Sequence, residues 1–96
     1  MNPLDHIAEK IIQEQELIIG PLAWSEASKV SGLSVSEEGK TKTVHIEAID
    51  HKAVVDALVA QYERLFGRAS HEACRAAVAS LLANMSLGDI PTSLRV

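Results

Sequence analysis

The sequence has few aromatic residues: Trp24, Tyr62 and Phe66 are the only three in 96 positions, against thirteen alanines. A core with so few large rings must be filled by aliphatic side chains and by helices that approach closely at small residues. The single cysteine, Cys74, excludes a disulfide within the chain and is typical of a reducing compartment. We therefore expect a small cytoplasmic domain without covalent cross-links.

Positive charge is also in short supply, with nine lysines and arginines against thirteen aspartates and glutamates and a net charge of −4. This balance gives no long-range attraction for nucleic acid or for an anionic membrane. No apolar run reaches the ~20 residues of a membrane span. Asp5 and Glu9 also interrupt the N-terminal stretch where a secretory leader would be apolar. Apolar residues nevertheless make up 47% of the chain, which predicts a folded domain rather than disorder.

Two helices are predicted in the first third of the chain. From Pro3 to Ile19, apolar residues recur at a spacing of three and four, which is the period of an amphipathic helix. Gly20 can end this helix in the left-handed conformation, and Pro21 suits the first position of the next. That second helix is predicted to end near Val30, with Gly32 as the left-handed glycine that follows it.

Two further helices are predicted in the second half. Asp50 is placed to cap a helix whose apolar stripe ends before Gly67. Ser70 is placed to cap a fourth helix, whose apolar stripe includes Cys74 and ends at Met85. A lone cysteine inside such a stripe usually acts as a small buried apolar side chain, so we expect Cys74 in the core.

Between the second and third helices the apolar period changes to two, which is typical of strands. Residues 33–36 and 41–48 flank the polar stretch EEGK and predict an antiparallel hairpin with Val44, Ile46 and Ala48 on its buried face. The residues predicted to face outward are Thr43, His45 and Glu47.

Together these segments predict an α+β fold in the order α-α-β-β-α-α, mostly helical, with one antiparallel two-stranded hairpin packed on the helices. Ninety-six residues leave no room for a second core. Residues 1–86 are therefore predicted to form a single domain, and residues 87–96 a C-terminal tail.

The apolar stripe of the first helix is the main candidate for a protein–protein interface. At roughly 27 Å for 18 residues, the helix is as long as the core of so small a domain, which leaves apolar surface for a second chain. Gln15 within the stripe is the kind of polar residue that sets register between two chains. Trp24 either anchors the core or, where partly exposed, contributes to binding. We expect a homodimer, with an interface formed by Leu4, Ile7, Ile11, Gln15, Ile18 and Trp24.

The tripeptide Gly39-Lys40-Thr41 matches the end of a phosphate-binding P-loop, but the rest of that motif is missing. The motif requires another glycine five residues earlier, where Ser34 stands. It also requires a helix directly afterwards, because the helix N-terminus holds the phosphates. The tripeptide is therefore interpreted as a polar hairpin turn, and no cofactor is predicted.

Catalytic and metal-binding patterns are also incomplete. His71 and Cys74 are three residues apart on one predicted helix, but zinc takes three or four ligands. His45-Ile46-Glu47 matches the HxE fragment of zinc deaminases without its PCxxC partner. Neither GxSxG nor another nucleophile motif is present. We expect no catalytic residues, no metal site and no enzyme activity.

Three functions are compatible with this pattern. The leading hypothesis is a non-enzymatic cytoplasmic protein-interaction module, homodimeric, with an adaptor or regulatory role and a further protein partner. A winged-helix DNA-binding regulator is the first alternative, although residues 22–31 would supply only Lys29, beside Glu26, to read bases. The second alternative is a small-ligand sensor with a pocket near Trp24.

Overall fold

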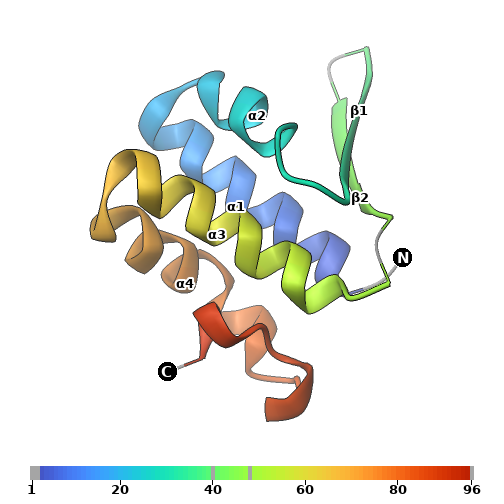
Figure 1. Cartoon of the computed structure of the whole chain (residues 1–96), viewed down its shortest axis with the longest axis vertical. Coiled ribbons are helices and arrows are strands. Elements are labelled where there is room, and N and C mark those ends of the chain that lie inside the picture. The colour runs from blue at the N-terminus through green and yellow to red at the C-terminus, as the bar shows by residue number, and fades with distance from the viewer. Residues whose placement is uncertain (1–2, 40, 48, 96) are drawn as a thin grey trace.

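The computed structural model describes residues 3–39, 41–47 and 49–95 and confirms the predicted α+β fold and its element order (Figure 1). A two-stranded antiparallel sheet packs beside the helices. The helices are α1 (Pro3–Ile19), α2 (Leu22–Ala27), α3 (His51–Phe66) and α4 (Arg68–Leu82), and the strands are β1 (Leu33–Glu38) and β2 (Thr41–Ile46). Two single-turn 3₁₀ helices follow α4, namely η1 (Leu87–Asp89) and η2 (Thr92–Leu94).

Helix α1 is the centre of the fold, because it packs against α2, α3, α4 and β2. Its 17 residues span roughly 26 Å at the usual rise of an α-helix. The molecule itself is 34 Å long. Elements from the whole chain therefore cover the apolar stripe of α1, and Ile7, Ile11 and Ile12 are at most 1% exposed.

A sharp turn at Gly20-Pro21 separates α1 from α2. Gly20 has a φ of 75°, so it ends α1 in the left-handed conformation as predicted. Helix α2 ends at Ala27, earlier than the predicted Val30, because the amides of residues 29 and 30 bond three residues back, as in a 3₁₀ helix. Gly32 has a φ of 86°. This confirms a left-handed glycine there, although it follows the 3₁₀ turn rather than the helix itself.

The hairpin has the predicted buried and exposed faces. Leu33 pairs with Ile46 and Val35 with Val44, which places these four apolar side chains on one face. Val44 and Ile46 are buried against the helices as predicted, whereas Ala48 lies outside the described residues. The predicted outward residues, Thr43, His45 and Glu47, are exposed.

Asp5 of α1 holds the end of the hairpin. Its side chain is almost fully buried, and its Oδ1 accepts the backbone N–H of Ile46 at 3.2 Å. Its Oδ2 lies 3.4 Å from Nδ1 of His45. A buried carboxylate without partners would be costly, so these contacts explain how an acidic residue sits beneath β2.

Helices α3 and α4 form a packed pair joined at Gly67. Asp50 caps α3 as predicted, because its Oδ1 accepts an N–H of the first turn at 3.1 Å. The predicted cap of α4 is wrong. Gly67 occupies the N-cap position, and Ser70 lies inside the helix with 5% exposure. Cys74 is fully buried, which confirms its predicted place in the core.

Residues 87–95, here called the C-terminal segment, pack on the helices instead of extending from them. The predicted tail therefore covers part of the core: η2 contacts α3 and α4, Leu94 is 1% exposed, and Pro91 is buried. The side chain of Asp56 on α3 accepts hydrogen bonds from Ser93 in this segment.

Candidate interaction surface

The structure places most of the predicted interface inside a single chain. Five of its six side chains are at most 8% exposed, namely Leu4, Ile7, Ile11, Gln15 and Trp24. These side chains have little surface with which to meet a second copy while the domain is folded, so the structure gives no support to an interface formed by them. The physical reason is that α4 and β2 reach both halves of α1, so the domain covers the long stripe by itself. Only Ile18 of the predicted set is exposed, at 58%.

Gln15 sets the register between α1 and α4 of the same chain. Its Nε2 donates to the backbone oxygen of Ser70 at 3.2 Å and to Sγ of Cys74 at 3.5 Å. Burial raises the pKa of the Cys74 thiol to about 11, although the bond from Gln15 acts in the opposite direction. Cys74 is therefore an inert core thiol and not an activated nucleophile.

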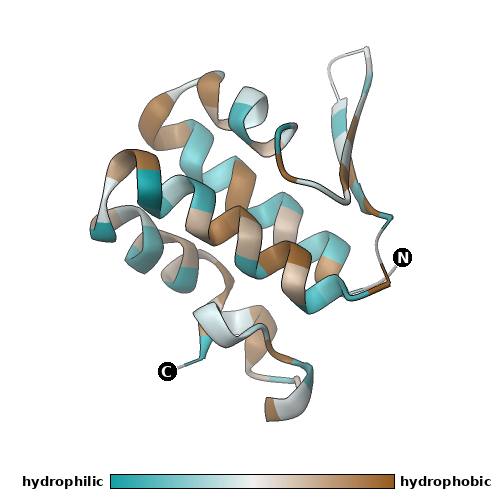
Figure 2. Cartoon of the chain, in the orientation of Figure 1, coloured by the Kyte–Doolittle hydropathy of each residue, from teal (hydrophilic) through white to brown (hydrophobic). Residues whose placement is uncertain are grey.

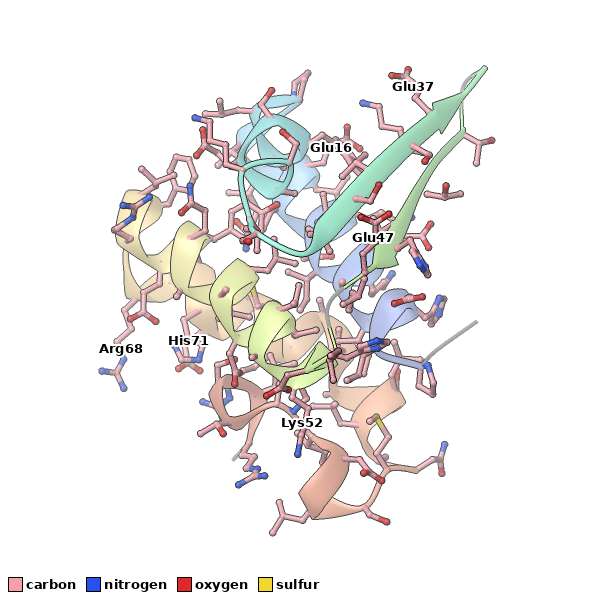
Figure 3. All side chains as sticks on the ribbon, turned by 45° about the vertical axis from the view of Figure 1, so that its right-hand side comes forward. Glu16, Glu37, Glu47, Lys52, Arg68 and His71 are labelled. Carbon is pink, nitrogen blue, oxygen red and sulfur yellow. The ribbon has the colours of Figure 1, made fainter. Side chains whose placement is uncertain are left out.

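Trp24 is a core anchor whose polar atom and ring face are both engaged within the chain. Its Nε1–H donates to Oε2 of Glu16 at 2.8 Å, and Nζ of Lys42 lies 5.2 Å from the ring centroid. Glu16 lies beside α2 in Figure 3. A shallow polar cavity of about 360 Å³ borders the indole, with Glu9 and Gln13 on its α1 side. The groups of Trp24 that would hold a ligand there already have partners.

Exposed apolar side chains gather instead at the end of the molecule where α1 turns into α2 and α3 turns into α4. Figure 1 shows both turns on the same side of the molecule, and Figure 2 shows apolar segments at both. Among the described residues, six large apolar side chains are exposed, and four of them belong to this end. They are Leu17, Ile18, Leu22 and Leu65, here called the corner patch. The most exposed is Leu17, at 81%.

Two hydrogen bonds hold the turns of the corner patch together. The hydroxyl of Tyr62 near the end of α3 donates to the backbone oxygen of Ala23 at the start of α2, at 2.7 Å. Burial raises the pKa of Tyr62, so this donor keeps its proton throughout the ordinary pH range. The bond from Gln15 to Ser70 joins the end of α1 to the start of α4 in the same way.

Two members of the corner patch belong to apolar stripes that run past the end of the core. Ile18 lies seven residues after Ile11, and Leu65 lies seven after Leu58, so each continues the buried face of its helix by two turns. The sequence alone predicts these stripes, but it does not show where the helices and strands that pack on them end. Leu65 belongs to the apolar stripe of α3 and is nevertheless 45% exposed.

Charges of opposite sign border the corner patch. Glu14 precedes Leu17 and Ile18 by three and four residues, so it lies next to them on α1. Arg64 and Arg68 flank the α3–α4 turn, both are exposed, and Figure 3 shows Arg68 pointing away from the body of the protein. The patch thus has an acidic border on α1 and a basic border at the α3–α4 turn.

The residues considered for metal binding have separate surroundings. His71 contacts Glu63 through Nδ1 and the backbone oxygen of Ser93 through Nε2, whereas Cys74 contacts Gln15. In the part of the chain that the structure describes, no three His, Cys, Asp or Glu side chains lie together as a metal site would require. His71 therefore has a structural role, linking α4 to α3 and to the C-terminal segment.

The helix considered for DNA reading offers little positive charge. Lys29, just after α2, forms an ion pair with Glu26 at 2.9 Å. Hydrogen bonds from Lys29 and from Gln61 hold the pKa of Glu26 below its ordinary value. Helix α2 itself has six residues and contains no lysine or arginine, so it offers no cation to address a phosphate or a base edge. Lys40 of the hairpin turn lies outside the described residues.

Comparisons with protein-family models, with curated proteins and with solved structures find no significant match to this chain. Among the described helices, none combines the length and the apolar character needed to cross a lipid bilayer.

Proposed function

We propose that this chain is a non-enzymatic cytoplasmic interaction module that pairs with a second copy through the corner patch. The observation that supports the proposal is that four of the six exposed large apolar side chains among the described residues, Leu17, Ile18, Leu22 and Leu65, lie at one end of the molecule. Contiguous exposed apolar patches on small domains commonly mark protein-binding sites. A regulatory or adaptor role would follow from such pairing.

The charged borders favour a second copy as the partner. In a two-fold symmetric pair, each patch meets itself and each border meets the opposite border of the partner. Glu14 of one copy would then face Arg64 and Arg68 of the other, an arrangement of opposite charges on both sides. A partner with one sign of charge would match only one of the two borders.

The size of the corner patch sets the expected strength of pairing. A standard stable interface has about 20–30 residues on each side, whereas the patch has four large apolar residues with polar neighbours. The dimer is therefore expected to be weak and reversible, with a dissociation constant on the order of 10–100 µM.

Sedimentation equilibrium between about 5 µM and 500 µM tests the proposal, because this range brackets the expected dissociation constant. The wild-type mass should rise from monomer toward dimer, and Leu17→Glu should remain monomeric throughout. Ile49→Glu is the matched control, since Ile49 is fully exposed and lies outside the corner patch. It should behave as the wild type does. Circular dichroism confirms that each variant is folded.

A charge exchange tests whether the partner is a second copy in the proposed orientation. Arg68→Glu alone should weaken pairing, and adding Glu14→Arg should restore it, because the two borders then match again. A wild-type monomer over the whole concentration range would contradict the proposal. So would equal weakening by Leu17→Glu and Ile49→Glu.

A further inference from the structure

A groove on the side of α4 is lined by apolar side chains and by two arginines. It lies between α4 and the C-terminal segment and has a cavity volume of about 330 Å³. Leu82 of α4 and Ile90 and Leu94 of the C-terminal segment line it, together with Arg75 and Arg95. This volume is at the lower end of the roughly 300–1,000 Å³ that small-molecule sites occupy.

Arg75 has a hydrogen-bond donor without an acceptor. Its Nη1 lies 3.2 Å from each carboxylate oxygen of Glu72, which neutralises its charge in part. Its Nε is buried, and no group among the described residues accepts a bond from it. A buried donor of this kind is costly to leave unpaired, so an acceptor supplied by a ligand would be bound favourably.

Arg95 adds a second positive charge to the same groove. Its Nε donates to the backbone oxygen of Ile90 at 3.2 Å, and in the described part of the chain no carboxylate forms an ion pair with it. The groove thus holds two guanidinium groups and one nearby carboxylate, although the whole chain is negatively charged. This local excess of positive charge attracts anions to the groove.

We propose that this groove binds the free anion of a medium-chain fatty acid. The carboxylate lies between Arg75 and Arg95, where guanidinium groups can bind its two oxygens. The alkyl chain lies on Leu82, Ile90 and Leu94, where burial of methylene groups stabilises it. The apolar lining disfavours a compact inorganic anion, and the paired arginines disfavour a neutral or cationic amphiphile. This inference does not depend on pairing through the corner patch.

Titration with octanoate, below the concentration at which it forms micelles, tests the proposal by calorimetry and by amide chemical shifts. We expect one saturable site, with shifts confined to α4 and the C-terminal segment. Arg75→Gln should weaken binding about tenfold, the amount expected for loss of one charge-assisted hydrogen bond. Arg68→Gln is the matched control, because Arg68 is an exposed arginine of the same helix outside the groove. It should bind octanoate as tightly as the wild type.

Octanol and octyltrimethylammonium distinguish recognition of the carboxylate from general uptake of alkyl chains. Both should bind at least tenfold more weakly than octanoate, since neither supplies an anionic acceptor. Three results would overturn the proposal: no saturable binding of octanoate, equal binding by Arg75→Gln and the wild type, or octanol binding as tight as octanoate. Thermal unfolding of each variant shows whether it is folded. Leu82→Gln is an independent variant in the apolar part of the groove, and it should also weaken the binding of octanoate.

Discussion

Ser93 donates both its backbone N–H and its hydroxyl to the same carboxylate oxygen of Asp56, at 2.9 and 2.6 Å. The backbone oxygen of Ser93 in turn lies 2.6 Å from Nε2 of His71. One residue of the C-terminal segment is therefore tied to α3 through its donors and to α4 through its acceptor. Leu94 beside it is buried, so polar and apolar contacts hold the segment at the same point.

Replacing Asp56 should loosen the C-terminal segment. Asp56→Ala removes a charged acceptor of two hydrogen bonds and is expected to destabilise the protein by about 2–3 kcal/mol. Hydrogen exchange of the Leu94 amide should become much faster than that of amides in α1. Asp89→Ala is the control, because Asp89 is an exposed aspartate of the same segment that lacks a side-chain bond among the described residues. Equal effects of the two substitutions would show that the Ser93 contact contributes nothing.

Two isoleucines seven residues apart on α1 should respond in opposite ways to the same change. Ile11 is fully buried, so Ile11→Asp places a carboxylate without partners in the core and should leave the chain unfolded at 25 °C. Ile18 is 58% exposed, so Ile18→Asp should leave it folded, with a change of stability below about 1 kcal/mol. Circular dichroism and urea unfolding measure both. A folded Ile11→Asp protein would show that α1 is not held in the core of its own chain.

Gly32 should be sensitive to substitution because of its backbone conformation. Its φ of 86° is one that residues with a Cβ rarely adopt. Gly32→Ala is expected to lower the free energy of unfolding by roughly 1–2 kcal/mol. Gly88 does not have a positive φ and has open space around its Cα, so Gly88→Ala should change stability by less than about 0.5 kcal/mol. Urea unfolding of the two variants side by side decides the matter.

The buried thiol of Cys74 should make the protein less stable in alkali. Burial raises the pKa of this thiol from 9.0 to about 11 in the folded state, so the unfolded chain loses its proton first as the pH rises. The protonated thiol of Cys74 contributes about 2–3 kcal/mol to the free energy of unfolding. This contribution is fully present below about pH 9 and is lost as the pH rises toward 11. Cys74→Ala should lose less stability between these pH values than the wild type does.

Thiol labelling provides a second measurement on Cys74. A thiol reagent should modify the native protein slowly at pH 8 and the urea-unfolded protein at once, because only the unfolded chain exposes the sulfur. Fast labelling of the native protein would contradict the burial of Cys74 and the explanation of its raised pKa.

Local signals in the sequence were enough to predict the helices, the hairpin and their order. The spacing of apolar residues is a property of neighbouring positions, and so are the cap at Asp50 and the left-handed glycines at positions 20 and 32. The predicted Ser70 cap was wrong because it relied on local signals alone. A serine suits an N-cap, but Ser70 lies inside α4, where its backbone oxygen accepts a hydrogen bond from Gln15 of α1. A contact between residues so far apart in the sequence leaves no local signal.

The surface was harder to predict than the fold, because it depends on which element covers which stripe. The sequence shows that α1 is apolar from Leu4 to Ile18 but not that α4 and β2 together cover it as far as Gln15. Asp5 gives no sign that it will accept the N–H of Ile46, 41 positions later. The sequence likewise gives no sign that Arg75 will line a groove with the C-terminal segment, or that its Nε will be buried without an acceptor among the described residues.

The central place of α1 has a consequence for how the protein emerges from the ribosome. This helix is synthesised before α4, which covers much of it. Until α4 has been synthesised, Ile7, Ile11 and Ile12 therefore lack part of the surroundings that bury them in the native state. Nascent chains that stop before residue 68 should consequently bind chaperones or aggregate, and the change to a compact domain should occur only after α4 has left the exit tunnel.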